Sequence, residues 1–286
     1  MNVGRFKTKA GEVRVGLVAD ESTLLDLTPA GIIQLQPLLE SEDPLAQLDR
    51  IARPGLPRLR LSEVTLCAPI ERQEVWAAGV TYLRSKTARM EESDFSASAY
   101  DRVYEAERPE LFFKSLPEKV VATGEPVGIR RDARWSVPEP ELALVLNSRG
   151  KIVGHTIGND MSSRDIEGEN VLYLPQAKIY DRSCALGPWL TLGTPEAAAR
   201  EWTIALRIER SGQEVFAGNT SVNQIKRRVD ELAGFLFRSQ SFPHGAILLT
   251  GTGIVPPDAF TLQQNDVVEI EISGIGRLRN PVLVVG

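Results

Sequence analysis

Residues 135–165 read Trp135-Ser-Val-Pro-Glu139-Pro-Glu141-Leu-Ala-Leu-Val-Leu-Asn147, then Ser148-Arg-Gly-Lys-Ile-Val153 and Gly154-His-Thr-Ile-Gly-Asn-Asp160-Met-Ser-Ser-Arg164-Asp165. The apolar run 142–146 predicts a buried strand. Pro140 indicates that the acidic residues on either side of it lie at the start of this strand or at a sheet edge. Residues two apart on a strand point to the same face, so we expect the carboxylates of Glu139 and Glu141 side by side.

Two adjacent carboxylates repel each other unless a cation lies between them. A divalent ion relieves that repulsion, and carboxylate oxygens suit the hard ions Mg²⁺, Ca²⁺ and Mn²⁺. Asp160, beyond a turn at residues 148–150, is positioned to supply a third oxygen. The alternative is that Glu139 and Glu141 lie on a solvated strand face, because most glutamates are exposed.

The wider pattern runs from Glu-x-Glu and the apolar strand to Gly-x-x-x-x-Asn-Asp-x-Ser-x-Arg-Asp, a later lysine, Gly187-Pro188 and Thr250-Gly251-Thr252. This pattern resembles the fumarylacetoacetate hydrolase family over roughly residues 70–286, and the block 159–165 is its most specific part. The resemblance implies that Glu139, Glu141 and Asp160 bind a divalent metal, with Mg²⁺ expected and Mn²⁺ or Ca²⁺ as alternatives.

A second block narrows the resemblance. Residues 162–178 read Ser-Ser-Arg-Asp-Ile-Glu-Gly-Glu-Asn-Val-Leu-Tyr-Leu-Pro-Gln-Ala-Lys. They are similar to the branch of the family that dehydrates 2-keto-3-deoxy-D-arabinonate. Lys178 matches the active-site lysine of the family, whereas Ile166-Glu167 stands where the family often has Ile-Gln.

The segment after Gly79 departs from the hydrolases of the family. Many of those carry a His-x-x-Glu dyad that activates a water for C–C cleavage, and the matching positions here are Ser85 and Ala88. The only histidines of the chain are His155 and His244. A hydrolase that depends on a histidine base would lack one.

Glu110, Phe112 and Lys114 are spaced to share one face of a strand. An acid and an amine on one face form either a surface ion pair, worth at most about 1 kcal/mol, or a proton-transfer pair beside the metal. The family match favours the second interpretation, because Phe112-x-Lys114 corresponds to a strand whose lysine faces the pocket.

The chemistry implied by the resemblance starts from a 2-keto acid, which chelates one ion through its carboxylate and ketone oxygens. The ion acidifies the C3 protons, since the carbanion is stabilised as a metal-bound enolate. We predict that Glu110 and Lys178 are the catalytic acid and base, in either order. Lys114 and Arg164 are expected to bind the substrate and to support the site through their charge or by orienting the metal ligands, and the amides around Gly251 and Thr252 are expected to receive the substrate carboxylate.

The resulting prediction is an enzyme, a Mg²⁺-dependent hydro-lyase that converts 2-keto-3-deoxy-D-arabinonate to 2,5-dioxopentanoate. Two alternatives remain open. One is C–C hydrolysis of acylpyruvates or 2,4-diketo acids, with Glu110 in place of the missing base. The other is a metal-binding member of the family without activity.

The composition of the 286 residues is that of an ordinary globular protein, with 42% hydrophobic and 25% charged residues. The net charge of −5 gives no attraction to nucleic acid, and no apolar run is long enough to span a membrane. Two cysteines and the absence of a recognisable signal peptide favour the cytoplasm.

The expected fold is mainly β within an α+β class. It consists of a mixed-sheet roll or sandwich with few helices over residues 71–286, and a small N-terminal α+β domain over residues 1–70. Residues 222–236 read as one amphipathic helix, and the polar segment 81–107 suggests either a mobile lid or a solvated helix. The resemblance implies a homodimer or a homotetramer.

Overall fold

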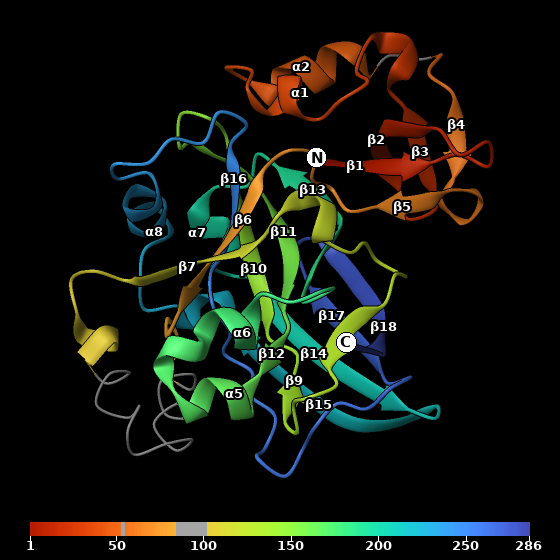
Figure 1. The fold of residues 1–286 in the computed structure, drawn as a ribbon. Coiled ribbons are helices and arrows are strands. Elements are labelled where there is room, and N and C mark those ends of the chain that lie inside the picture. Colours follow the sequence, from red (N-terminus) through yellow and green to blue (C-terminus); the bar gives the residue numbers. More distant parts are fainter. Residues whose placement is uncertain (53–54, 84–101) are drawn as a thin grey trace.

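The computed structural model describes residues 1–52, 55–83 and 102–286, and two β-sheets dominate it (Figure 1). The larger sheet has 11 strands in the order β4-β3-β2-β1-β13-β11-β10-β16-β6-β7, with β5 paired to β1. These strands are β1 (Asn2–Lys7), β2 (Val13–Asp20), β3 (Thr23–Asp26), β4 (Arg58–Arg60), β5 (Thr65–Cys67), β6 (Glu74–Gly79), β7 (Glu110–Ser115), β10 (Pro140–Leu146), β11 (Ile152–Asp160), β13 (Cys184–Leu192) and β16 (Ala246–Leu249).

The smaller sheet has five strands in the order β15-β14-β17-β18-β8. They are β8 (Val127–Arg130), β14 (Thr203–Arg210), β15 (Gln213–Ser221), β17 (Val267–Ile272) and β18 (Gly276–Val285), and a separate pair joins β9 (Ser136–Val137) to β12 (Ser162–Ser163). Both sheets are mixed, because β16 runs parallel to β6 and β18 runs parallel to β8. The prediction of a mainly β, mixed-sheet fold with few helices is confirmed.

Strand β10 lies in the middle of the larger sheet, and all seven of its residues are buried. Its alternating side chains enter two different cores. Leu142 and Leu144 join the apolar cluster shared with the five-stranded sheet. Ala143 and Val145 join a second cluster that includes Leu48 from the N-terminal part of the chain. A strand covered on both faces is a rigid base for the acidic residues at its start.

The helices are short and lie around the sheets. They include α1 (Gln36–Leu39), α2 (Pro44–Ile51), α5 (Arg164–Glu169), α6 (Leu174–Lys178), α7 (Glu196–Ala199) and α8 (Val229–Leu236), with 3₁₀ turns at 28–30, 61–63, 117–119, 171–173 and 222–224. Residues 102–105 are helical as well. Figure 1 shows α5 and α6 side by side, close to the ends of β9 and β12. Within the described ranges, no helix combines the length and apolar character needed to cross a bilayer.

The prediction of one helix over residues 222–236 is wrong. A 3₁₀ turn ends at Gln224, and α8 begins only at Val229. The intervening residues are not helical, because Ile225 forms a β-bridge with Tyr82 and the amide of Lys226 donates to the Thr81 carbonyl at 3.0 Å. Pairing with a distant part of the backbone therefore outweighs local helical periodicity.

The N-terminal part of the chain joins the larger sheet through β1, whose first residues pair with β13. Strands β1 to β5 and helices α1 and α2 form the upper right of Figure 1. A small N-terminal domain over residues 1–70, separate from 71–286, stays a prediction. The expected lid at residues 81–107 falls largely outside the described residues.

Candidate active site

Three carboxylates meet where β10 begins and β11 ends. The amide of Asp160 donates to the Glu139 carbonyl at 3.0 Å, which places these two residues opposite each other in the antiparallel pair. Glu141 lies opposite Gly158, which has no side chain. Glu139, Glu141 and Asp160 therefore project from one face of the sheet, as the two-residue spacing predicts.

The acidic cluster, which we define as Glu139, Glu141 and Asp160, is almost completely buried, with exposed fractions of 3%, 1% and 1%. The interpretation of a solvated strand face is therefore wrong. Carboxylate oxygens from the three residues lie within 4.8 Å of one another. Burial, reinforced by the charges of Asp160 and Glu139, raises the pKa of Glu141 well above its ordinary value. Three converging buried carboxylates fit a hard divalent cation.

Three buried cations neutralise the acidic cluster. Lys178, at the end of α6, places its Nζ 2.9 Å from Glu139 Oε2 and 3.0 Å from Asp160 Oδ2. Lys114 Nζ lies 2.5 Å from Asp160 Oδ1. Arg164 Nη2 lies 2.9 Å from Glu139 Oε1. Buried charges that are paired in this way avoid the large cost of an isolated buried ion.

Lys114 and Arg164 lie where they support the acidic cluster. Both side chains contact the acidic cluster directly, and neither belongs to the lining of the cavity described next. In this structure they hold the metal-ligand candidates in place, and contact with a substrate remains a prediction for them.

A nearly closed cavity of about 10 Å³ lies over the acidic cluster. It contains the other seven residues predicted for the site, and Glu167 in addition. Its lining consists of Ala78, Gly79, Val80, Glu110, Phe112, Glu139, Glu141, Asp160, Glu167, Lys178, Gly251 and Thr252. The fold thus joins residues that are more than 140 positions apart in the sequence, although their chemical roles stay predictions.

Glu110 reaches this cavity because its neighbour across the sheet is a glycine. Glu110 begins β7 and pairs with Gly79 at the end of β6. A Cβ at position 79 would lie 2.0 Å from Glu110 Oε2. The carboxylate therefore occupies the space that any other side chain would fill.

The turn at residues 250–252 closes the opposite side. Gly251 has a φ of +90°, and a Cβ there would lie 2.1 Å from Thr81 Oγ1, so the position favours glycine. Its amide donates to Glu141 Oε2 at 2.5 Å. In this structure the amide orients a member of the acidic cluster, and its predicted contact with a substrate carboxylate remains a prediction.

Sequence reasoning missed Glu167 and Ser162 as residues of the site. Ser162 Oγ lies 2.6 Å from Lys178 Nζ. Glu167 is 2% exposed and lies one helical turn after Arg164 on α5. The sequence held one signal for Glu167, because the family often has glutamine at this position.

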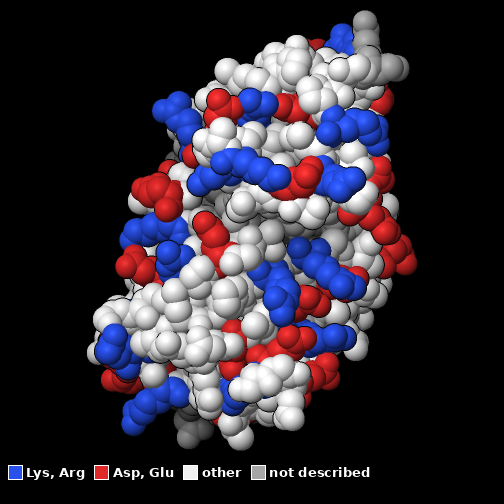
Figure 2. All heavy atoms as spheres, turned by 90° about the vertical axis from the view of Figure 1, so that its right-hand side faces the viewer, with Lys and Arg blue, Asp and Glu red and all other residues white. Residues whose placement is uncertain are grey.

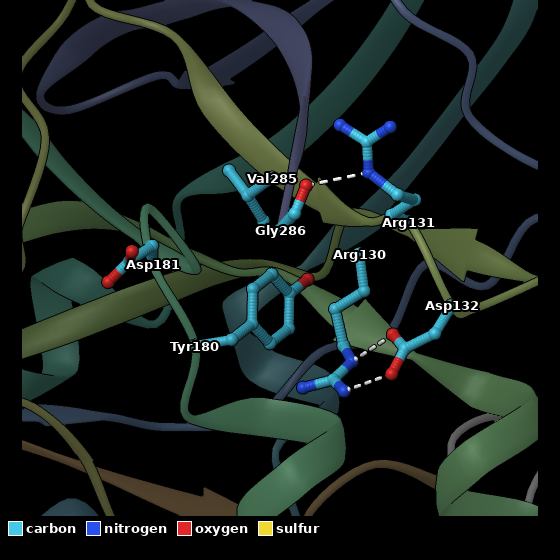
Figure 3. Close-up of a pocket in the computed structure, with 7 residues that line it drawn as sticks. All are labelled: Arg130, Arg131, Asp132, Tyr180, Asp181, Val285 and Gly286. Carbon is cyan, nitrogen blue, oxygen red and sulfur yellow. Dashed lines mark hydrogen bonds and ion pairs between the residues drawn. The ribbon is translucent and has the colours of Figure 1, made fainter.

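A larger hollow, of about 390 Å³, lies beside α6 and contains none of the predicted residues (Figure 3). Arg130 and Tyr180 line it, with the guanidinium 5.9 Å from the ring centroid. Arg130 also donates to the Gln176 carbonyl of α6 at 3.2 Å and forms a two-pronged ion pair with Asp132. This cluster supports the helix that carries Lys178.

Comparison with known proteins places the site in a family. Residues 74–283 match the model of the fumarylacetoacetate hydrolase C-terminal domain. The probable 2-keto-3-deoxyxylonate dehydratase of Haloferax volcanii is 43% identical, over 96% of this chain and 97% of its own length. The 2-dehydro-3-deoxy-D-arabinonate dehydratase of Saccharolobus solfataricus is 39% identical, over 93% and 91%.

The fold agrees with that of a solved relative. A structure of 2-keto-3-deoxy-D-arabinonate dehydratase complexed with magnesium and 2,5-dioxopentanoate superposes with a TM-score of 0.84 and 34% identity, and the match covers 100% of this chain and 99% of that one.

Proposed function

Because the chain belongs to the fumarylacetoacetate hydrolase family, we propose that it is a Mg²⁺-dependent hydro-lyase that converts 2-keto-3-deoxy-D-arabinonate to 2,5-dioxopentanoate and water. The observation that carries this proposal is the cavity in which Glu110 and Lys178 lie beside the acidic cluster. Arabinonate and xylonate of the same series differ only in their configuration at C2 and C3. Their 2-keto-3-deoxy derivatives have no stereocentre at either carbon, so the two derivatives are the same compound. The names of both relatives therefore point to a single five-carbon acid.

Mg²⁺ is the cofactor we propose, because the solved relative contains magnesium and the acidic cluster offers buried oxygens from three residues. Glu139, Glu141 and Asp160 would hold it, and Mn²⁺ or Ca²⁺ would suit the same oxygens. When bound, the ion supplies Lewis-acid polarisation of the 2-keto group, which acidifies the hydrogens on C3.

Glu110 and Lys178 are the residues proposed to move protons. One of them takes a proton from C3, and the other gives a proton to the C4 hydroxyl, which leaves as water. The unsaturated product then tautomerises, so that C5 becomes the aldehyde. Both side chains line the same cavity, Glu110 from β7 and Lys178 from α6, so both are close to a substrate bound there.

The remaining predicted residues are proposed to bind and orient. Lys114 and Arg164 balance the charge of the acidic cluster, so that its oxygens stay in place when a substrate enters. Gly251 and Thr252 line the cavity at the turn 250–252, where the carboxylate of the substrate is proposed to lie. Backbone amides at such turns are suited to anions.

The partners we propose are a small 2-keto acid and further copies of the chain, as a homodimer or homotetramer in the cytoplasm. Nucleic acid and membrane are not proposed as partners. On the face shown in Figure 2, basic and acidic side chains are interspersed, whereas a nucleic-acid surface needs a patch of positive charge.

The deciding experiment is proton NMR of the purified protein with Mg²⁺ and two substrates in parallel, 2-keto-3-deoxy-D-arabinonate and acetylpyruvate. An aldehyde signal from the first alone, abolished by a chelator, is the expected result. Acetate and pyruvate from the second would instead identify a C–C hydrolase. Bound Mg²⁺ without turnover of either compound would favour a metal-binding protein without this activity.

A further inference from the structure

Glu167 is a buried carboxylate of the cavity that the proposed chemistry does not use. It lies on α5, three residues after Arg164, so both side chains share one face of the helix. Arg164 reaches Glu139 Oε1 at 2.9 Å, which shows that this face is turned toward the acidic cluster. Glu167 is 2% exposed and lines the same cavity as Glu110 and Lys178.

The cavity has two distinguishable ends. Glu141 accepts from the amide of Gly251 at 2.5 Å, so the turn 250–252 lies at the Glu141 end of the acidic cluster. Arg164 approaches Glu139, so α5 lies at the other end. Two residues of a strand span about 7 Å, which is comparable to the length of an extended five-carbon acid.

The cavity in this structure has room for about one water molecule, so a substrate that enters has to displace some of the lining side chains. The two ends then fix how the substrate is oriented, and this step rests on the proposed function. The carboxylate and ketone lie toward the acidic cluster and the turn 250–252. Carbons C3 and C4 lie beside Glu110 and Lys178, where protons are exchanged. The remaining carbon, C5, then falls at the end formed by α5.

We infer that Glu167 is a specificity-determining residue that accepts a hydrogen bond from the C5 hydroxyl of the substrate. A carboxylate oxygen accepts hydrogen bonds, so a hydroxyl of the substrate is a suitable partner and a methyl group is not. An acid that ends in a methyl group would lose this bond and place carbon against a buried polar group. Sites built around a polar group of the substrate reject such analogues strongly.

The test compares two substrates that differ only at C5. They are 2-keto-3-deoxy-D-arabinonate and the 4-hydroxy-2-oxopentanoate of the same C4 configuration, which lacks the C5 hydroxyl and still loses water across C3 and C4. For the unaltered enzyme we expect kcat/KM to favour the first by about 100-fold. In Glu167→Leu the preference should fall to within about threefold, and Glu167→Gln should retain an intermediate preference of about tenfold.

The matched control is Glu169→Leu, because Glu169 lies on the same helix and is exposed. It should keep the preference of the unaltered enzyme. Thermal stabilisation by Mg²⁺ shows whether each variant is folded with its metal site intact. If Glu167→Leu does not fold, Glu167→Gln decides the question.

The outcomes separate this inference from the proposed function. An unaltered enzyme that dehydrates neither compound would overturn the proposed function. Suppose instead that the enzyme dehydrates the first compound and that both Glu167 variants keep the substrate preference of the unaltered enzyme. That result would overturn only the role of Glu167. Equal loss of activity on both substrates would also overturn it, because the carboxylate would then act on the reacting carbons.

Discussion

Lys178 joins three parts of the site through one amino group. Its Nζ lies within 3.0 Å of Glu139, Asp160 and Ser162. Lys178 is 1% exposed, and its amine also lies 5.8 Å from the ring centroid of Phe112. The same group balances the acidic cluster, and the proposed proton exchange with a substrate requires one of these three bonds to break.

We predict that Lys178→Met and Glu110→Gln each lower kcat/KM by about 100- to 10,000-fold, the range typical for loss of a general acid or base. Mg²⁺ binding should persist in both, because the acidic cluster is intact. Dehydration rates and the Mg²⁺-induced shift in Tm measure the two effects. Lys119→Met, at an exposed position, is the control. Full activity in either variant would remove that residue from the mechanism.

His155 gives a prediction about pH. It is 2% exposed and packs edge-on against Trp202, and burial lowers its pKa from 6.5 to about 4. Between pH 4 and pH 6.5, His155 carries a proton in the unfolded chain but not in the folded chain. The free energy of unfolding therefore falls as the pH decreases through this window, by about 2 kcal/mol between pH 7 and pH 5.

His155→Phe should lack this contribution, because phenylalanine does not titrate. Urea unfolding of both proteins at pH 7 and pH 5 measures the difference, and comparison with the variant cancels the contributions of all other groups. Parallel losses of stability in the two proteins would show that His155 is protonated in the folded state.

Individual residues were predictable where a regular strand fixed their direction. Glu139 and Glu141 were identified because the two-residue period places them on one face. Glu167 was missed because it lies on a six-residue helix, whose orientation depends on contacts of Arg164 with a distant strand. No periodicity in the sequence encodes that contact.

At the scale of elements, strands were predicted better than helices. The run 142–146 is apolar throughout and forms a buried strand, whereas residues 222–236 have helical periodicity and form a helix only from Val229. Arg227, which is 8% exposed, donates to the carbonyls of Val103, Ala106 and Glu107. Such tertiary bonds are invisible to a local pattern and override it.

Helix α6 is also held by a hydrogen bond from a distant side chain, and this bond leads to a third prediction. Arg130 donates to the carbonyl of Gln176, which is one of the last carbonyls of a short helix and therefore has no partner within the helix. Arg130→Gln should loosen the end of α6 and displace Lys178. We expect kcat to fall by about 3- to 10-fold with little change in KM, because one hydrogen bond of this kind contributes about 1 kcal/mol.

Arg131→Gln is the matched control. Arg131 is the next residue, but its Nε donates to the Gly286 carbonyl at 2.6 Å instead of to α6. It should leave kcat unchanged. Equal effects of the two substitutions on kcat would mean that Arg130 does not act through the helix.

At the scale of the whole molecule, the site depends on two cores that meet at β10. One face of β10 contributes Leu142 and Leu144 to the cluster shared with the five-stranded sheet. The other contributes Ala143 and Val145 to the cluster that contains Leu48 of α2. The acidic residues continue the second face, so the N-terminal part of the chain shares a hydrophobic core with the strand that carries them.

This arrangement bears on the prediction of a separate N-terminal domain. If residues 1–70 were energetically independent, a cavity in their core would melt them alone and leave the metal site folded. Because their core is shared with β10, we predict instead that Leu48→Ala lowers the stability of the entire chain. The expected cost is about 2–5 kcal/mol, the range for truncating a fully buried leucine.

Differential scanning calorimetry, with and without Mg²⁺, distinguishes the two cases. A single transition should move to lower temperature in Leu48→Ala, and Mg²⁺ should still raise it, because an ion bound only to the folded chain stabilises everything that unfolds with the site. Ile33→Ala, at a position that is 66% exposed in the same part of the chain, should leave the transition nearly unchanged. If Leu48→Ala instead produced an early transition insensitive to Mg²⁺ and a late one that responds to it, residues 1–70 would unfold independently. The core that α2 shares with β10 would then exist without making the N-terminal part and the acidic cluster unfold together.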